Sequence, residues 1–416
     1  MIDINLTAKV VIIGAGPSGS VAASLLAQKG YEVIIVEKEQ FPRFSIGESL
    51  LPQSMTFFKQ AGLLDEISKE ECFQYKNGAV FSNSFKFTSV DFNEKFANGY
   101  SSTYQVKRGV FDKILADKVE SSGVKVFYKT QVKDVLQNSK GIQLKVYNLE
   151  THKEYFIDAE FILDGSGFGR VLPRLLNLET PSEFPTRHAY FCHIRDNIKR
   201  EDFDRNKIFI GIHPRQRDIW YWLIPFADGT ASVGVVVPND FFNDNNSTTT
   251  NEHVLKDFIQ QMPYLDSILE NAVFITNAQK ITGYSSNVSR LYGDNYALLG
   301  NAAEFLDPVF SSGITIAVKS ASLAVNVLDK RFRGEEVDWS EEFVKPLYVG
   351  INTFKEFVHA WYSGELQKII FQSNINSSIK RMVISVLAGY AWDENNPFVN
   401  DSKRKLKLLS SLCSDI

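Results

Sequence analysis

Apolar runs and glycine-rich turns alternate along the first part of the chain and predict an α/β fold. Residues 10–13 form a short apolar run, and Gly-Ala-Gly-Pro-Ser-Gly follows at 14–19. A helical pattern extends to Lys29, and 32–36 has the pattern of a second strand, ending at Glu37. A strand, a glycine-rich turn, a helix and a second strand with a terminal acid are the context that a dinucleotide-binding fingerprint requires.

Each glycine of such a fingerprint has a mechanical role. Gly14 permits the tight turn, Gly16 lets the backbone approach a pyrophosphate, and Gly19 lets the helix pack closely on the strand. The helix N-terminus offers N–H groups and a positive dipole to the phosphates, and Glu37 is placed to accept hydrogen bonds from ribose hydroxyls. We therefore expect a bound ADP moiety; the alternative is a glycine-rich turn that binds nothing.

Two later apolar runs have the same strand-then-turn character. The run 161–163 ends in Asp164-Gly165, and the run 295–299 ends in Gly300-Asn301. Ligands dock at the carboxyl ends of parallel strands in open α/β sheets, so the turn at Asp164-Gly165 is expected near a ligand. Four segments that precede residue 161 have the alternation of antiparallel strands: 124–127, 131–135, 142–146 and 155–157.

Between 187 and 283 the chain changes to a β-type composition, which predicts a separate antiparallel sheet inserted into the nucleotide domain. A helix is expected from Asp307–Gly313 onward, and the chain beyond Asp338 has a helical pattern. The expected division is a discontinuous cofactor domain (1–80, 104–185 and 285–330), a β-sheet substrate domain (81–103 and 186–284) and a helical C-terminal region (331–416).

Two short segments are candidates for chemistry. Trp220 and Trp222 share one face of a strand that ends at Pro225; the alternative is an aromatic pair that only fills the core face of a sheet. Lys76 lies among aromatic and apolar neighbours before a strand. A lone lysine there is usually a solvated surface residue, but burial near a pocket is also open.

A third segment, 41–49, mixes a proline, an arginine and a small-residue turn. Arg43 and 47–49 either line the cofactor or form a polar loop in which Ser49 caps the next helix. Arg108 follows at a strand-to-helix turn, where its guanidinium could reach a phosphate.

Composition excludes several classes of function. The net charge of -4 argues against nucleic acid as the main partner. The 3 cysteines are unclustered and the 6 histidines form no metal-binding spacing, so no metal is expected. No apolar run reaches the length of a membrane span and no signal peptide is evident, so a cytoplasmic protein is expected. A basic stretch at 403–407 is either a membrane-surface helix or, more simply, the solvated edge of a C-terminal helix.

Taken together, these motifs resemble the flavin-dependent monooxygenase and halogenase superfamily, whose FAD domain is like that of glutathione reductase. The resemblance covers roughly residues 8 to 385. It implies a Rossmann-type FAD-binding domain, an inserted antiparallel substrate sheet and non-covalently bound FAD. The residues that it implies for cofactor binding are Gly14, Gly16, Pro17, Ser18, Gly19, Glu37, Lys38, Arg43, Ser49, Arg108, Asp164, Gly165, Gly300, Asn301, Pro308 and Gly313.

Two features resemble the halogenase branch of that superfamily. Residues 220–225 satisfy its WxWxIP motif in full, and Lys76 with Gly78 looks like its active-site lysine. In such enzymes reduced FAD and oxygen convert chloride or bromide to hypohalous acid, and the lysine delivers the halogen to an electron-rich ring. The resemblance implies Lys76, Trp220 and Trp222 as catalytic residues, and a halide at the amides of Ser312 and Gly313.

The chain departs from this family at two positions. It has Gly300-Asn301 where the family usually has Gly-Asp, and Phe310 where tryptophan-specific members have a glutamate. The second departure resembles members that act on phenolic or pyrrolic rings, often tethered to a carrier protein. No second nucleotide fingerprint is evident in the sequence, so reduced flavin is expected to come from a separate flavin reductase.

Three other functions stay open at this point. The same fold serves aromatic hydroxylases and isoprenoid double-bond reductases. A protein of another class, a non-catalytic FAD-binding sensor or partner subunit, is also compatible with Asn301 and Phe310.

Overall fold

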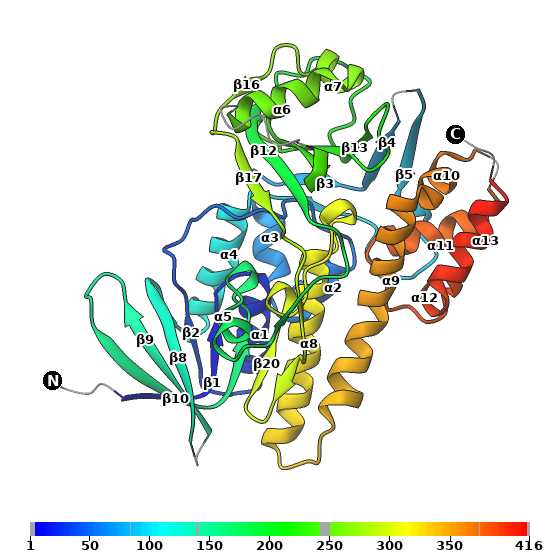
Figure 1. Cartoon of the computed structure of the whole chain (residues 1–416). Coiled ribbons are helices and arrows are strands. Elements are labelled where there is room, and N and C mark those ends of the chain that lie inside the picture. The colour runs from blue at the N-terminus through cyan, green and yellow to red at the C-terminus, as the bar shows by residue number, and fades with distance from the viewer. Residues whose placement is uncertain (1–4, 84, 139–140, 242–249, 374, 414–416) are drawn as a thin grey trace.

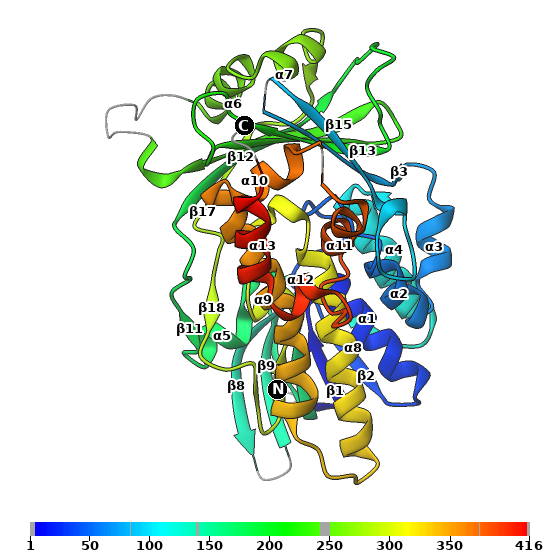
Figure 2. The same cartoon turned by 90° about the vertical axis from the view of Figure 1, so that its right-hand side faces the viewer.

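The protein is built on two large sheets with helices around them (Figures 1 and 2). The computed structural model describes residues 5–83, 85–138, 141–241, 250–373 and 375–413. One sheet lies near the N-terminus, and the other lies at the opposite end of the molecule beneath α6 (Asn251–Gln260) and α7 (Pro263–Ile268).

The first sheet has a parallel centre. Its strand order is β19-β20-β10-β1-β2-β7, and every neighbouring pair from β20 to β7 is parallel. The apolar runs noted above lie at its middle and are buried on both faces, as parallel strands covered by helices require. Its members are β1 (Asn5–Ile13), β2 (Val33–Val36), β7 (Lys125–Phe127), β8 (Thr130–Asn138), β9 (Gly141–Asn148), β10 (Glu154–Asp164), β19 (Tyr292–Gly293) and β20 (Tyr296–Leu298).

Part of the expected antiparallel region belongs to this parallel centre. The segment 125–127 pairs in parallel with β2, so its prediction as an antiparallel strand is wrong. The reason is that a strand of three residues carries too few positions for alternation to identify its partner. The hairpin β8–β9 and its pairing with β10 are antiparallel, as expected. The segments 155–157 and 161–163 are one continuous strand, β10.

The second sheet runs in the order β16-β12-β15-β14-β13-β4-β5, with β17 beside β12. All its pairs are antiparallel except β13 with β4. Because β4 begins at Gly78, the chain enters this sheet slightly before the expected boundary after residue 80. Its members are β4 (Gly78–Ser82), β5 (Phe87–Asp91), β12 (Arg187–Arg195), β13 (Lys207–Ile212), β14 (Trp220–Pro225), β15 (Thr230–Pro238), β16 (Val273–Phe274) and β17 (Gln279–Thr282).

The two faces of the second sheet belong to different hydrophobic cores. Trp220 and Trp222 of β14 face the large core shared with the first sheet, whereas Tyr221 and Leu223 face a smaller core. Phe258 of α6 belongs to that smaller core, which packs behind the sheet. The period of two along β14 therefore gives the two tryptophans the common face that the sequence predicts.

Helices cover the first sheet and the side of the molecule. Helix α1 (Pro17–Gln28) follows the glycine turn and packs against α8 (Gly313–Phe332). Helix α9 (Lys345–Ser363) runs along α8 toward the second sheet (Figure 1). The chain then forms four shorter helices at one side of the molecule: α10 (Glu365–Phe371), α11 (Ser377–Leu387), α12 (Pro397–Asn400) and α13 (Ser402–Ser411).

Short elements connect these layers. They are α2 (Ser54–Gln60), α3 (Leu64–Lys69), β3 (Gln74–Lys76), η1 (Phe92–Glu94), β6 (Thr103–Gln105), α4 (Arg108–Ser121), η2 (Gly167–Gly169), α5 (Val171–Leu175), β11 (Glu179–Thr180), η3 (Asn239–Phe241), β18 (Asn287–Val288), η4 (Gly300–Ala302), η5 (Pro308–Phe310) and η6 (Ser340–Val344). The pair β3–β6 connects the first part of the chain to the start of the second sheet.

The basic stretch near the C-terminus lies on α13. Leu406 and Leu409 of this helix are buried against the protein, while Lys403, Arg404 and Lys407 are exposed. The helix therefore packs an apolar face on the protein and exposes its basic residues, an arrangement that fits either alternative. Within the described residues, no helix has both the length and the apolar character needed to cross a membrane.

Candidate functional site

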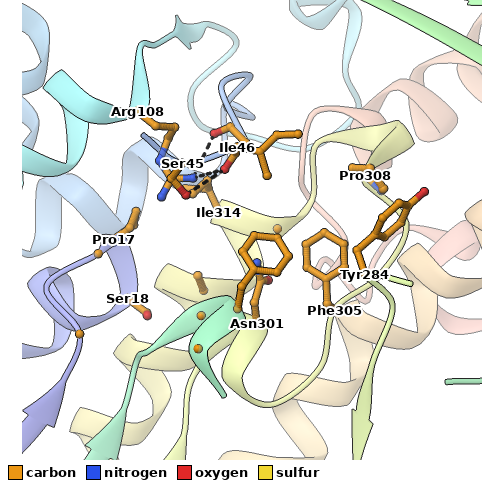
Figure 3. Close-up of a pocket in the computed structure, with 18 of the residues that line it drawn as sticks. Pro17, Ser18, Ser45, Ile46, Arg108, Tyr284, Asn301, Phe305, Pro308 and Ile314 are labelled. Carbon is orange, nitrogen blue, oxygen red and sulfur yellow. Dashed lines mark hydrogen bonds between the residues drawn. The ribbon is translucent and has the colours of Figure 1, made fainter. Parts of the chain in front are cut away.

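A cleft of about 770 Å³ lies between the carboxyl ends of the parallel strands and the second sheet. Turns of the first sheet, strands of the second sheet and the start of α8 meet in it. In Figure 3, Arg108 and Ile46 lie on one side of the cleft, opposite Asn301, Phe305 and Pro308. The expected site residues that line the cleft are Gly14, Gly16, Pro17, Ser18, Glu37, Lys38, Arg43, Ser49, Arg108, Gly165, Trp220, Trp222, Asn301, Pro308, Ser312 and Gly313.

The glycine turn has the geometry that its sequence predicts. Gly14 has φ +93°, and a Cβ there would lie 2.7 Å from the Gly165 carbonyl oxygen. A Cβ on Gly19 would lie 2.0 Å from the Gly14 carbonyl oxygen, so Gly19 permits helix packing and does not line the cleft. Gly16 is different, because the nearest atom to its Cβ would be Arg43 Nη2 at 3.7 Å. The space beside Gly16 is therefore open to a ligand.

Glu37 lies directly beside the glycine turn at the end of β2. Its Oε2 accepts a hydrogen bond from the Ala15 N–H at 2.8 Å, and its Oε1 accepts one from the Glu39 N–H at 2.8 Å. These bonds fix the carboxylate at the wall of the cleft. Each carboxylate oxygen has a further lone pair for a ribose hydroxyl.

Two arginines share one buried carboxylate at the side of the cleft. Arg43 Nη1 lies 2.7 Å from Asp112 Oδ2, and Arg108 forms a bidentate pair with the same carboxylate at 2.8 and 2.9 Å. Arg108 also donates to the Ile46 carbonyl oxygen at 2.5 Å, which ties the 41–49 segment to α4 (Figure 3). Because one carboxylate compensates two guanidinium groups, the pair leaves net positive charge for a phosphate.

Residues 43–49 line the cleft, as the first of the two alternatives expects. Ser49 does not cap α2, which begins at Ser54 with Gln53 before it. Instead Ser49 forms a β-bridge with Gln105, and its hydroxyl oxygen accepts a hydrogen bond from Lys76 Nζ at 2.7 Å.

The opposite wall is made by the turns after β20. Asn301, Pro308 and Gly313 line the cleft, and Ser312 is the N-cap residue of α8. The Ser312 side chain makes no capping hydrogen bond. The first amides of a helix have no intrahelical acceptor, so the start of α8 can receive an anion. Gly300 does not line the cleft; a Cβ there would lie 2.7 Å from the Ala317 Cβ, so Gly300 permits α8 to approach.

Asp164 also lies outside the lining of the cleft. Its carboxylate is fully buried and accepts hydrogen bonds from the Ser166 N–H at 2.9 Å and the Leu172 N–H at 2.7 Å. Burial raises its pKa. Asp164 therefore fixes the turn that presents Gly165 to the cleft, and the structure gives it no direct contact with the cleft itself.

Both tryptophans of β14 lie in the wall of the cleft. Their ring centroids are 5.8 Å apart, and Trp222 packs against Phe191. Each indole N–H donates a hydrogen bond, from Trp220 to the Tyr362 hydroxyl at 2.9 Å and from Trp222 to Ser232 Oγ at 3.1 Å. A role at the site and a role in the core are thus compatible, because the core face that the tryptophans fill is also a wall of the cleft.

Lys76 is fully buried, which excludes the surface alternative. Its Nζ donates to Ser49 Oγ and to the Leu50 carbonyl oxygen, both at 2.7 Å. It lines a separate cavity of about 20 Å³, enclosed mainly by apolar side chains such as Phe81, Phe92 and Leu387. This cavity, here called the lysine cavity, shares four wall residues with the cleft: Ile208, Ile210, Val309 and Ser311. Lys76 thus lies immediately behind one wall of the cleft.

Burial lowers the pKa of Lys76 from its usual value near 10.5 to about 7. The folded protein then binds fewer protons at this group than the unfolded chain does between about pH 7 and 10.5, so this group makes stability rise with pH in that window. Lys76→Met should remove this dependence. The stability of the variant relative to wild type should grow as pH falls from 10 to 7, by as much as several kcal/mol, since one pKa unit corresponds to about 1.4 kcal/mol.

Urea unfolding at several pH values measures this effect. The exposed Lys59 on α2 provides the matched control, and Lys59→Met should differ from wild type by a nearly constant amount. A pH-independent difference for Lys76→Met would contradict a lowered lysine pKa.

The cleft fits the FAD that the motifs imply. It offers open space beside Gly16, a carboxylate for ribose at Glu37, and two arginines for phosphate. Its far end has the apolar and aromatic walls that an isoalloxazine ring requires, from Ile208, Trp222 and their neighbours. Among the described residues, no group of three or more His, Cys, Asp or Glu side chains could hold a metal.

Two groups at this site, Asp112 and Tyr362, were not predicted as site residues from the sequence. Asp112 was detectable in principle, because it lies one helical turn after Arg108 and such i,i+4 pairs contact each other. Tyr362 was not, because its hydroxyl reaches Asp307 across 55 residues of sequence and from a different layer of the fold.

Comparison with known proteins agrees with this geometry. The family model described as FAD binding domain matches residues 7–340, which span the cleft-forming part of the chain. A crystal structure of a flavoprotein/dehydrogenase from Cytophaga hutchinsonii superposes with a TM-score of 0.93 and 40% identity, covering 98% of each chain.

Two curated relatives extend the comparison. A 1H-pyrrole-2-carbonyl-[peptidyl-carrier protein] chlorinase from Pseudomonas fluorescens is 29% identical, covering 95% of this chain and 92% of that protein. A flavin-dependent halogenase from Penicillium aethiopicum is 30% identical, covering 84% of this chain and 70% of that protein. The chain therefore belongs to the FAD-binding domain family, within the superfamily of flavin-dependent halogenases and monooxygenases, and is an FAD-dependent enzyme of the halogenase type.

Proposed function

We propose that this enzyme halogenates an electron-rich phenolic or pyrrolic ring, and that Lys76 carries the halogen from the cleft to that ring. The observation behind the proposal is the position of Lys76: a fully buried amine in a small apolar cavity that shares its walls with the FAD cleft. Trp220 and Trp222 then form the wall of the cleft on the side of the cofactor, and Ser312 and Gly313 receive chloride or bromide.

Reduced FAD supplies the chemistry that turns oxygen and a halide into hypohalous acid. Lys76 acts after that step. A pKa of about 7 leaves much of the amine neutral, and a neutral amine is a nucleophile. It attacks the halogen of hypohalous acid, forming an N–halogen bond and releasing water; the substrate ring then takes the halogen, loses a proton and returns the free amine. In its protonated form Lys76 would instead hold hypohalous acid by donating a hydrogen bond.

The size of the lysine cavity limits what can occupy it. About 20 Å³ admits one molecule near the size of water, since a water needs about 10–15 Å³. A hypohalous acid is of that order, whereas an apolar cavity that binds benzene measures about 150 Å³. The aromatic substrate must therefore enter by displacing covering side chains, among which Phe92 and Leu387 come from η1 and the end of α11.

The lining also bears on the class of substrate. Of the residues that the structure describes, no carboxylate lines the lysine cavity, and Lys76 is the only charged residue in its lining. A neutral or anionic ring suits these walls, whereas the ammonium group of free tryptophan would lack an acceptor. The relative from Pseudomonas fluorescens is named for a pyrrole-2-carbonyl group held on a peptidyl carrier protein, and we extend that possibility of a tethered substrate to this enzyme. A separate reductase would supply reduced FAD.

The test uses purified enzyme with FAD, a flavin reductase, NADH and bromide, and a panel of phenols, pyrroles and carrier-bound pyrrole-2-carbonyl groups. We expect brominated product by mass spectrometry for at least one neutral or phenolate ring and none for free tryptophan. Hydroxylated product, or a reduced carbon–carbon double bond, without any brominated product would contradict the proposal and favour the hydroxylase or the reductase alternative.

A further inference from the structure

A chain of hydrogen bonds connects three layers of the fold. Trp220 Nε1–H donates to the Tyr362 hydroxyl at 2.9 Å, and Tyr362 in turn donates to Asp307 Oδ2 at 2.7 Å. Tyr284 donates to the same carboxylate oxygen at 3.2 Å. Tyr362 lies in the last turn of α9, in the helical region whose role the proposed function leaves open.

Asp307 controls the turn that follows it. Its Oδ1 accepts a hydrogen bond from the Val309 N–H at 3.1 Å, which closes the first turn of η5. The chain then passes through Ser311, with φ +57°, to the start of α8 at Gly313. Asp307, Pro308 and Gly313 all line the cleft. A shift of the Asp307 carboxylate would therefore move one wall of the FAD site.

The ionisation of Asp307 depends on a small set of neighbours. Burial raises its pKa, and the hydrogen bonds from Tyr362 and Tyr284, together with the charge of Arg187, oppose that rise. The Arg187 guanidinium lies 3.7 Å from the centroid of the Tyr362 ring and donates to the Asp218 carbonyl oxygen at 3.0 Å. Among the described residues, these are the charged and titratable groups that face Asp307.

We propose that Tyr362 is a positioning residue of the FAD site, whose hydroxyl holds Asp307, and with it the turn 308–313, against the bound flavin. The inference rests on FAD binding and is independent of halogen transfer. It assigns the C-terminal helical region a direct part in shaping the cofactor site, because α9 supplies the hydroxyl.

The test is a pH titration of the FAD-loaded protein, followed by flavin absorbance without turnover. Wild type should show a transition from Asp307, and Asp307→Asn should remove it. Tyr362→Phe keeps the ring beside Arg187 but removes a donor to the carboxylate. The midpoint should then rise by roughly one to two pH units, because a hydrogen bond to a charged group favours the charged form.

Two further variants separate positioning from general damage. Tyr284→Phe removes the longer bond to the same oxygen and should shift the midpoint in the same direction by less. Tyr390→Phe removes a hydroxyl that donates to the Tyr100 carbonyl oxygen at 2.8 Å in the same helical region, and should leave the midpoint unchanged. Three results would overturn the inference. Wild type could show no transition, Tyr362→Phe and Tyr284→Phe could both leave the midpoint unchanged, or Tyr390→Phe could shift the midpoint equally.

Discussion

Replacing Lys76 with methionine should abolish halogenated product while FAD binding and oxygen consumption stay close to those of wild type. Lys76 acts only after hypohalous acid has formed, and its amine lies behind the wall of the cleft, in the lysine cavity. Methionine has a similar length and fills the same apolar surroundings, so the walls should keep their positions. We expect a loss of at least a thousandfold in brominated product, measured by mass spectrometry alongside an oxygen electrode.

The matched control is another lysine whose pKa burial lowers. Lys319 of α8 lies near the rings of Phe57 and Trp392, at 5.7 and 5.8 Å, and does not line the cleft or the lysine cavity. Lys319→Met should retain halogenation. If Lys76→Met still halogenates at a rate near that of wild type, the proposed transfer through the amine is wrong, although the FAD assignment would survive.

Gly16→Val should abolish FAD binding without unfolding the protein. A Cβ at Gly16 meets nothing closer than Arg43 Nη2 at 3.7 Å, so the first carbon of the side chain does not clash with the folded chain. The room that valine takes is the space that we assign to the pyrophosphate, which approaches the backbone at this glycine. Flavin fluorescence titration should show affinity reduced by at least a hundredfold, while the thermal unfolding midpoint without FAD changes little.

Substitutions at the other two fingerprint glycines should instead lower the stability of the protein itself. Gly19→Ala would place its Cβ 2.0 Å from the Gly14 carbonyl oxygen, and Gly14→Ala would have to keep φ +93° against Gly165. Both changes should lower the unfolding temperature of the protein without FAD, because they strain the chain itself. Unchanged FAD affinity in a folded Gly16→Val protein would show that the pyrophosphate does not bind beside Gly16.

The nucleotide half of the site was predictable from sequence because its signals are local. The glycine turn, Glu37 and the strand ends occupy one βαβ unit or follow an apolar run, so spacing alone places them. The parallel strand 125–127 was mistaken for an antiparallel one because pairing depends on partners that three residues do not reveal. Asp164 and Gly300 were expected to bind the cofactor but do not line the cleft, because the first accepts a hydrogen bond from the Leu172 N–H and the second packs against Ala317.

The chemistry-bearing half was predictable only in part. The two tryptophans share a face because a strand has a period of two. The burial of Lys76, by contrast, requires a cover from η1 and α11, and no local pattern around residue 76 indicates it. The same is true of Tyr362, whose partners Asp307 and Trp220 lie far from it in the sequence.

Strand β14 places residues of two different kinds next to one another. Trp220 and Trp222 face the cleft, while Tyr221 and Leu223 face the smaller core behind the sheet, against α6. Residues that face the cleft therefore alternate along β14 with residues that hold the strand against the smaller core. Trp220 and Trp222 are at once wall of the cleft and part of the large core, so a substitution that reshapes the cleft at either position also removes core packing.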